Sequence, residues 1–393
     1  MSIQSRGDAK RLNRNPLRKI HAGWVVFLAA FLLMMVGIEA IDTTRLGAAT
    51  RQLLLGGVGM MGAFFIVFVP QKRLRQASWW LYIVALILLI FLLIPSIPDF
   101  IVHPRNGARR WINFGIIDMQ PSEIAKVAFV FAMASHLRFK KHYRKFNGLI
   151  LALFVAIPPM FLVLYEPDLG TAMLFLPALI AMLFAAGAKY RHLIVIGLLA
   201  IAVAGSMYPV LQKHQQNRIK AFWAQVQGDN RFEQSIGYQG ARAMMLIGAG
   251  QETGVGKERA AELLRANHLP EEHNDMIFAV IALRWGFWGA IAVWSLYVLF
   301  SVGGIVAAVG CRDPFPRLVA VGLTTMVFSQ MIINTAMCLG IAPITGMTLP
   351  FVSAGGSSLV IAWLMVGILF GIAMRRDPVM TREGFQFSVK GVN

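Results

Sequence analysis

Ten long apolar stretches follow one another along this chain of 393 residues and leave little sequence for anything else. A helix needs roughly 20 apolar residues to cross the hydrocarbon core of a bilayer. The stretches cover residues 22–41, 52–70, 79–98, 121–137, 148–165, 169–187, 192–211, 276–308, 318–340 and 350–374. Because backbone polar groups must be satisfied internally in lipid, such stretches form helices. The sequence therefore predicts an all-α polytopic membrane protein with ten transmembrane helices.

Basic residues give the expected orientation of these spans. Lys and Arg are enriched in cytoplasmic loops, and the bias is counted over short loops. With the N-terminus inside, the tails and inner loops carry most of the 37 Lys and Arg residues, and the short outer loops carry few. We therefore expect both termini in the cytoplasm, with a tail at 1–21, a transmembrane domain at 22–376 that includes a large outer loop at 212–274, and a tail at 377–393.

The net charge of +18 then has a simple explanation. It reflects the topology together with attraction to anionic lipid headgroups. A nucleic-acid-binding protein would need a folded basic domain, and the sequence offers none. We therefore expect membrane lipids, and no nucleic acid, around this chain.

Acidic residues indicate where the chemistry lies. Most of the 19 Asp and Glu residues fall in outer loops or in the outer halves of spans. An ionisable group at membrane depth costs several kcal/mol and is a functional candidate. A cluster that opens outward indicates chemistry or cation binding at the outer face. Carboxylates also avoid the anionic inner leaflet, and this explains part of the same bias.

The loop before the fourth span places two arginines beside an aromatic residue, as Arg109, Arg110 and Trp111. A guanidinium binds phosphate in bidentate fashion, so the pair favours a phosphate site. Trp111 can stack on a ring or a sugar face. The alternative is an interfacial Trp with arginines that extend toward the headgroups.

The fourth span opens with Gln120-Pro121-Ser122-Glu123 and has Lys126 about one turn inside the apolar run. Glu123 and Lys126 are three residues apart and can pair on one face of a helix. One hypothesis is a structural ion pair. The other is a lysine that positions a carboxylate or a phosphate from another helix.

Two aspartates stand just before outer helix starts. Asp168, in Glu166-Pro167-Asp168, either caps the sixth helix or joins Glu166 in a cluster at the outer mouth. Asp275 precedes the eighth span, where partial desolvation would raise its pKa and suit it to act as a general base, although a capping role is also open. His273 lies nearby without metal-ligand spacing around it.

Two glycine-rich strings differ in whether they could bind an anion. In the segment 349–358, which ends in Ser357 and Ser358, Gly and Ser allow non-helical backbone whose free N–H groups can meet an anion, or else they serve close helix packing. The string at 254–257 lacks the Gly and Ser/Thr that a phosphate-binding loop requires. After it, the stretch Lys257–Arg265 is amphipathic and should lie on the membrane or pack over the outer mouth.

Taken in order, the strings NGARRWI, QPSEIAK, EPDLGT, HNDMIFAVI and LPFVSAGGSS on ten spans closely resemble the SEDS family (shape, elongation, division and sporulation). The resemblance covers roughly residues 20–376. It implies a SEDS fold in the bacterial cytoplasmic membrane and a peptidoglycan glycosyltransferase that polymerises lipid II at the outer face, in elongation or division. It also implies a nascent glycan chain as product and a class B penicillin-binding protein as partner.

The resemblance further implies roles for individual residues. Asp275 would deprotonate the acceptor sugar hydroxyl, and Glu123 and Lys126 match the pair that accompanies it. Arg109, Trp111 and Asp168 match other motif positions, and with Arg110 and Ser357 they are the expected substrate-binding residues. Lys126, Arg109 or a divalent cation would balance the leaving diphosphate. The sequence itself names no metal ligands and no certain cofactor.

Several departures mark a divergent member. Asn274 replaces the usual Thr before the aspartate, Leu283 and Arg284 replace an acidic pair, and Ala354 replaces a Tyr. The first span carries Glu39 and Asp42 where the family has small residues. Because an arginine inside a span needs a partner, we expect Glu39 or Asp42 to provide one for Arg284.

Two other functions stay open at this point. Polar groups in many spans are compatible with a transporter of lipid-linked precursors. The lost acidic pair is compatible with a non-catalytic SEDS scaffold for a penicillin-binding protein. The motif variants match no single branch of the family, so the sequence predicts no choice between elongation and division.

Overall fold

The computed structural model describes residues 21–105, 108–115, 118–138, 146–227 and 237–375. In this part of the chain, ten long helices coincide with the ten predicted spans. They are α1 (Ala22–Thr44), α2 (Leu46–Val67), α3 (Gln71–Leu92), α4 (Pro121–Leu137), α5 (Phe146–Tyr165), α6 (Leu169–Ala186), α7 (Tyr190–Ser206), α11 (Ile277–Val309), α12 (Pro314–Cys338) and α13 (Ser357–Met374). The all-α polytopic prediction is confirmed.

The ten helices differ in how strongly they signal a span. By length and composition, seven of the described helices could each cross a membrane: α1, α2, α3, α6, α11, α12 and α13. Helices α5 and α7 contain shorter apolar stretches, and α4 carries the buried Glu123 and Lys126. His21 packs its ring 5.5 Å from that of Phe370, so the start of α1 and the end of α13 lie at the same face.

Several predicted span boundaries were wrong, most of all in α2, α3 and α13. The second helix begins at Leu46 rather than at residue 52. The third helix begins at Gln71, after Pro70, and ends at Leu92, ahead of Pro95 and Pro98, so it lies earlier than the expected 79–98. The last span was expected from residue 350, but α13 begins only at Ser357. Residues 339–356 form a loop that is largely buried against protein, where irregular backbone is tolerated at membrane depth.

Helix α11 is not continuous. Gly286 has φ 67° and ψ −158°, which breaks the helix into an outer piece at 277–285 and a longer inner piece. Only glycine adopts this backbone region without strain. The break matters because Asp275 stands directly before the outer piece.

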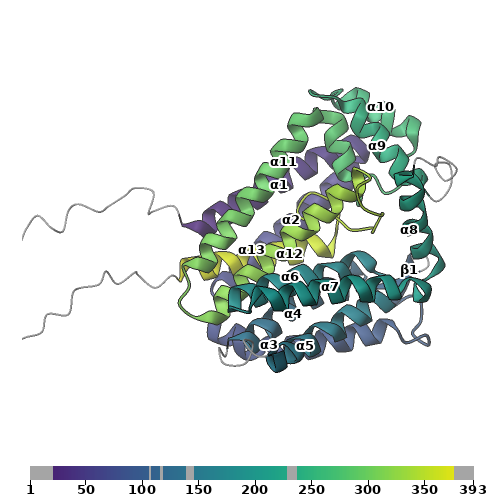
Figure 1. Cartoon of the computed structure of the whole chain (residues 1–393). Coiled ribbons are helices and arrows are strands. Elements are labelled where there is room, and N and C mark those ends of the chain that lie inside the picture. Colours follow the sequence, from purple (N-terminus) through teal and green to yellow (C-terminus); the bar gives the residue numbers. More distant parts are fainter. Residues whose placement is uncertain (1–20, 106–107, 116–117, 139–145, 228–236, 376–393) are drawn as a thin grey trace, which may run out of the picture.

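The outer segment between α7 and α11 contains η3 (Tyr208–Val210), α8 (Lys213–Val226), α9 (Tyr238–Gly250) and α10 (Lys257–Asn267). Figure 1 shows α8, α9 and α10 gathered at one end of the bundle. Helix α10 contacts α1, α9 and α11, with Ala260 and Leu264 buried, as its amphipathic pattern predicted.

A small antiparallel sheet, which the sequence did not predict, stands between α3 and α4. Its strands are β1 (Val102–Arg105), β2 (Ala108–Asn113) and β3 (Asp118–Met119), in the order β1-β2-β3. Val102 pairs with Ile112, and both pack on Leu92 at the end of α3. The sheet thereby carries Arg110 and Trp111 on β2 over the outer end of the helices.

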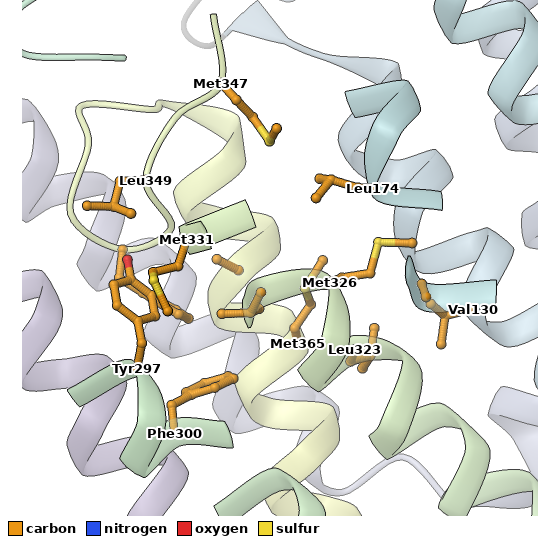
Figure 2. Close-up of a cluster of buried hydrophobic side chains, with 14 of the residues drawn as sticks. Val130, Leu174, Tyr297, Phe300, Leu323, Met326, Met331, Met347, Leu349 and Met365 are labelled. Carbon is orange, nitrogen blue, oxygen red and sulfur yellow. The ribbon is translucent and has the colours of Figure 1, made fainter. Parts of the chain in front are cut away.

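Helix α12 lies at the centre of the packing, against α4, α6, α11 and α13. Figure 2 shows its Leu323, Met326 and Met331 among side chains of the neighbouring helices, with Met347 and Leu349 of the loop above them. Elsewhere large apolar side chains face outward, as lipid contact requires: Phe64, Trp80, Phe154 and Leu198 are all exposed. The buried side chains of α12 and its neighbours thus form the core on which the loop 339–356 packs.

Candidate active site

A cavity of about 650 Å³ lies at the end of the bundle where α8, α9 and α10 gather. Its lining comes from the start of α2, from β2, α4, α6 and α8, and from the loops that precede α11 and α13. It brings together predicted residues from motifs far apart in the sequence: Arg110, Trp111, Glu123, Asp168 and Asp275. The volume suits a polar group the size of a sugar or a diphosphate.

Asp275 lines this cavity with its carboxylate free of helix capping. The N-cap of α11 is Met276, and no side chain caps that helix, so the capping alternative for Asp275 is not observed. Its main-chain oxygen accepts a hydrogen bond from Asn334 Nδ2 at 2.8 Å. Burial, with help from nearby Glu271 and against the pull of Arg218, raises the pKa of Asp275 to about 7. A carboxyl in this range can both accept and release a proton near neutral pH.

Arg218 on α8 is the cation beside Asp275. The two side chains flank Gly346, where an added Cβ would lie 3.3 Å from Arg218 Nη1 and 3.4 Å from Asp275 Oδ2. Arg218 Nη1 also donates to the main-chain oxygen of Ile344 at 3.2 Å. The loop before α13 thus fixes the guanidinium next to the carboxylate.

Glu123 and Lys126 form the predicted ion pair, with 2.9 Å between Glu123 Oε1 and Lys126 Nζ. Lys126 is 2% exposed and also donates to Gln330 Oε1 at 3.0 Å. Glu123 lines the main cavity, whereas Lys126 lines a very small neighbouring one. Gln330 and Asn334 are one turn apart on α12, so this helix joins the ion pair to the Asp275 backbone.

Asp168 is the N-cap of α6. Its Oδ1 accepts from Thr171 N at 3.2 Å, and its Oδ2 accepts from Thr171 Oγ1 and Gln120 Nε2, each at 2.9 Å. The capping hypothesis is therefore observed, and the residue also faces the cavity.

Glu166, which was weighed as a member of the same outer cluster, is buried, and its two carboxyl oxygens have no hydrogen-bond partner among the described residues. Burial first, and then Asp168, raises the pKa of Glu166 to about 9, although Arg110 opposes the change. The side chain is thus neutral near pH 7 and adds no charge to the mouth of the cavity.

The two adjacent arginines of β2 point in different directions. Arg110 lines the cavity and donates to the main-chain oxygens of Glu166, at 2.8 Å, and Pro167. Arg109 does not line it, because its guanidinium donates to the carbonyls of Pro95, at 2.9 Å, and Ile97 after α3. An alternation of direction is what successive residues of a strand must show.

Ser357, expected among the substrate-binding residues, does not line the cavity. Its Oγ accepts a hydrogen bond from Gln120 N at 3.3 Å. Its neighbours Gly355, Gly356 and Ser358 do line it, and the N-cap Gly356 makes no side-chain bond to the helix start. The backbone at the start of α13 therefore faces the cavity.

Sequence reasoning missed several charged or titratable residues of the lining, namely Arg45, Arg51, Asp118, His214, Arg218 and Glu271. His273, which was named from the sequence without a role, also lines the cavity. Burial, with the nearby Arg218, lowers the pKa of His214, so the imidazole is neutral near pH 7. One signal for α8 was present, since His214 and Arg218 are four residues apart and share a face of an amphipathic helix. For Arg45 and Arg51 the sequence offered only their position in an outer loop.

Among the described residues, no group of three or more His, Cys, Asp or Glu side chains is arranged so that it could hold a metal ion. The divalent cation considered from the sequence therefore stays a prediction.

The family model of the cell cycle proteins FtsW, RodA and SpoVE matches residues 18–377. The chain belongs to the SEDS family. It is a multi-pass protein of the bacterial cytoplasmic membrane, as its spans and this membership require. The resemblance seen in the sequence motifs is confirmed over nearly the whole chain.

Curated relatives and solved structures agree with this assignment. The chain is 33% identical over 329 residues to stage V sporulation protein E of Bacillus subtilis, covering 83% of this chain and 86% of the relative. It is 34% identical over 336 residues to the probable peptidoglycan glycosyltransferase FtsW of Nitrosomonas europaea, covering 83% and 82%.

Among solved structures, the crystal structure of the rod shape determining protein RodA of Thermus thermophilus has a TM-score of 0.67 and 26% identity, covering 90% of this chain and 97% of that chain. A chain from a structure titled for the coordination of polymerization and crosslinking by a peptidoglycan synthase complex has a TM-score of 0.76 and 26% identity, covering 90% and 98%.

The departures of this SEDS chain from the family pattern have structural partners. Asn274 Nδ2 donates to Glu271 Oε2 at 2.6 Å, and Asn274 O accepts from Ser353 Oγ at 2.7 Å. Ala354 N donates to His273 O at 3.0 Å, which needs no side chain at 354. The expectation that Glu39 pairs with Arg284 is confirmed, with 2.9 Å between Glu39 Oε2 and Arg284 Nη2.

Proposed function

We propose that this chain is a peptidoglycan glycosyltransferase that polymerises lipid II at the outer face of the cytoplasmic membrane. Its family and the names of its FtsW relatives support the activity. The observation that carries the proposal is the Asp275 carboxylate, which stands in the cavity beside Arg218 with a pKa raised to about 7. The surviving pair of Glu123 and Lys126 also favours a catalytic member over a scaffold.

In this mechanism Asp275 accepts the proton of the acceptor sugar hydroxyl. The hydroxyl oxygen then attacks the anomeric carbon of the donor, and the bond from that carbon to the diphosphate oxygen breaks. Undecaprenyl diphosphate leaves with the bonding electrons. A general base of matched pKa contributes typically 10²–10⁴-fold to such a step, and holding two lipid-anchored substrates in one cavity contributes further.

The charge that develops on the departing diphosphate needs positive partners. Arg218 and Arg110 face the cavity, and Arg45 and Arg51 line it at the start of α2. The start of α13, which no side chain caps, adds the positive end of a helix dipole. We assign the diphosphate to these arginines and to the start of α13. Arg218 and Arg110 thereby take the role of balancing its charge, which the sequence had given to Arg109 or Lys126.

Glu123 and Lys126 act together in this proposal. Lys126 is too deeply enclosed to meet a bulky substrate, and it holds Glu123 at the cavity wall. Glu123 in turn presents a carboxylate to the sugar hydroxyls. Trp111 offers its ring as a stacking surface at the same wall.

We also propose a class B penicillin-binding protein as partner. The solved structure with the TM-score of 0.76 comes from a peptidoglycan synthase complex, and its title pairs polymerization with crosslinking. A SEDS chain that makes uncrosslinked glycan would need such a transpeptidase beside it.

The direct test supplies purified protein, alone and with its cognate partner, with lipid II and measures glycan polymer on gels. We expect polymer from the wild-type protein and a loss of about 100-fold or more in Asp275→Asn, because the amide cannot accept the proton. Glu262→Gln, at an exposed position on α10, is the matched control and should keep full activity.

Equal polymer from Asp275→Asn would remove Asp275 from its role. If the wild-type protein made no polymer while its complex with the partner stayed intact, the scaffold hypothesis would replace the enzyme. Lipid II movement across vesicles without polymer would favour the transporter instead.

A further inference from the structure

The break in α11 is filled by another part of the chain. At the break, the helix loses its own backbone partners, and residues 250–256, which we call the clip, provide them. Val255 N and Gly256 N donate to Leu283 O and Arg284 O at 3.0 and 3.2 Å, and Phe287 N and Trp288 N donate to Gln251 O and Glu252 O at 2.8 and 3.3 Å. The clip thus bonds to both sides of the break.

The backbones of the clip and of α11 lie too close together at the break for a side chain at either glycine. A Cβ at Gly286 would lie 2.4 Å from Glu252 O, and one at Gly254 would lie 2.2 Å from Arg284 O. Both glycines also have positive φ, 67° and 81°. Glycine at positions 254 and 286 therefore lets the two backbones approach closely. This explains the glycine at 254 in the string 254–257, which does not match a phosphate-binding loop.

Two ion pairs join this region to the outer end of α1. Arg284 Nη2 lies 2.9 Å from Glu39 Oε2, and Arg284 Nη1 donates to Thr43 Oγ1 at 2.9 Å and to the main-chain oxygen of Glu39. The same guanidinium stands 4.3 Å from the centre of the Trp285 ring. Lys257, the first residue after the clip, pairs with Asp42.

We propose that Glu39 and Arg284 position Asp275 by locking the outer piece of α11, to which the clip is hydrogen-bonded, against α1. The outer piece at 277–285 is a short rigid helix with Asp275 directly before it and Arg284 near its other end. Fixing Arg284 to α1 fixes the direction of this piece. Glu39 and Arg284 do not line the cavity, so they act through Asp275 and are positioning residues. The kinetic part of this inference rests on the proposed function.

The test combines hydrogen exchange with kinetics in a double-mutant cycle of Glu39→Gln, Arg284→Gln and both together. The Glu39 side chain is 60% exposed, so Gln is tolerated there and the fold stays intact. We expect each single variant to speed amide exchange at Val255 and Gly256 about three- to tenfold. The double variant should add little to Arg284→Gln, because the contact of the Glu39 carboxylate is with Arg284, whereas Arg284 also bonds to Thr43 and to the main chain of Glu39.

In the polymerisation assay we expect kcat to fall about three- to tenfold in the same variants with KM for lipid II unchanged, since the cavity wall is untouched. Glu262→Gln is the matched control: it breaks the exposed Arg259–Glu262 pair on α10, 2.9 Å long, and should change neither exchange nor kcat.

Exchange at the clip equal to wild type in Glu39→Gln would overturn the lock. Faster exchange with an unchanged kcat would show a merely structural pair and overturn the positioning role. If the wild-type protein makes no polymer, the proposed function fails, and the exchange cycle still decides the lock by itself.

Discussion

Two aspartates in similar sequence positions have different environments. Asp168 and Asp275 each precede an outer helix. Asp168 accepts hydrogen bonds from Thr171 and Gln120, whereas Asp275 caps no helix and faces a cavity. The difference comes from neighbours that are remote in sequence, chiefly Arg218 and Asn334. At the residue scale, function therefore follows from which acid is left without a helix to cap.

The pKa of Asp275 leads to a prediction about pH. Asp275 acts as a general base only when it is ionised. We therefore expect kcat/KM to rise as the pH increases through about 7 and to be low at more acidic pH. Glu271 raises this pKa and Arg218 lowers it. Removing the positive neighbour in Arg218→Gln should shift the rise to higher pH, and Glu271→Gln should shift it lower, each by about one unit. Profiles of kcat/KM from pH 5.5 to 9 measure both shifts, and shifts in the same direction would contradict the assignment.

Among the elements around the cavity, the loop 339–356 forms a wall that the sequence did not predict. The last span was expected to begin at residue 350, but Gly346, Phe351 and Gly356 all have positive φ, so the chain is not helical before Ser357. Ser353 and Ala354 then hydrogen-bond to the loop that holds Asp275. The loop is stable because protein rather than lipid surrounds it.

Gly346 gives this loop a test of its own. Gly346→Ala would place a methyl group between Arg218 and Asp275 and would strain a backbone at φ 74°, at a cost of about 1–2 kcal/mol. We expect kcat/KM to fall roughly tenfold or more. The matched control is Gly57→Ala on α2, where an added Cβ meets nothing within 4 Å. Equal losses in the two variants, measured with thermal midpoints in detergent, would show that alanine acts through general stability.

At the scale of the whole molecule, charge sets which end of the bundle faces outward. The cavity, α8, α9 and α10 lie at one end, and the turn between α11 and α12 belongs to the other face. The positive-inside rule assigns this turn, with Arg312, to the cytoplasm. The active-site proposal depends on this assignment, since the proposed polymerisation of lipid II takes place at the outer face.

Cysteine labelling tests the orientation. In a background with Cys311→Ser and Cys338→Ala, Glu262→Cys on α10 and Arg312→Cys in the inner turn place single exposed thiols at opposite ends. A membrane-impermeant maleimide should label position 262 in intact cells and position 312 only after the membrane is opened. The opposite pattern would contradict the topology and the outward site together.

Apolar length and local motif spacing are properties of contiguous residues, so the ten helices and the family were predictable from the sequence, and Glu123 and Asp275 could be named as candidates. The Glu123–Lys126 pair was also predictable, since three-residue spacing on a helix fixes it. Three features appear only in the folded molecule: Arg218 stands beside Asp275, Arg109 turns away from the cavity, and the clip fills the break at Gly286. These arrangements depend on contacts between segments far apart in the chain, which no local pattern encodes.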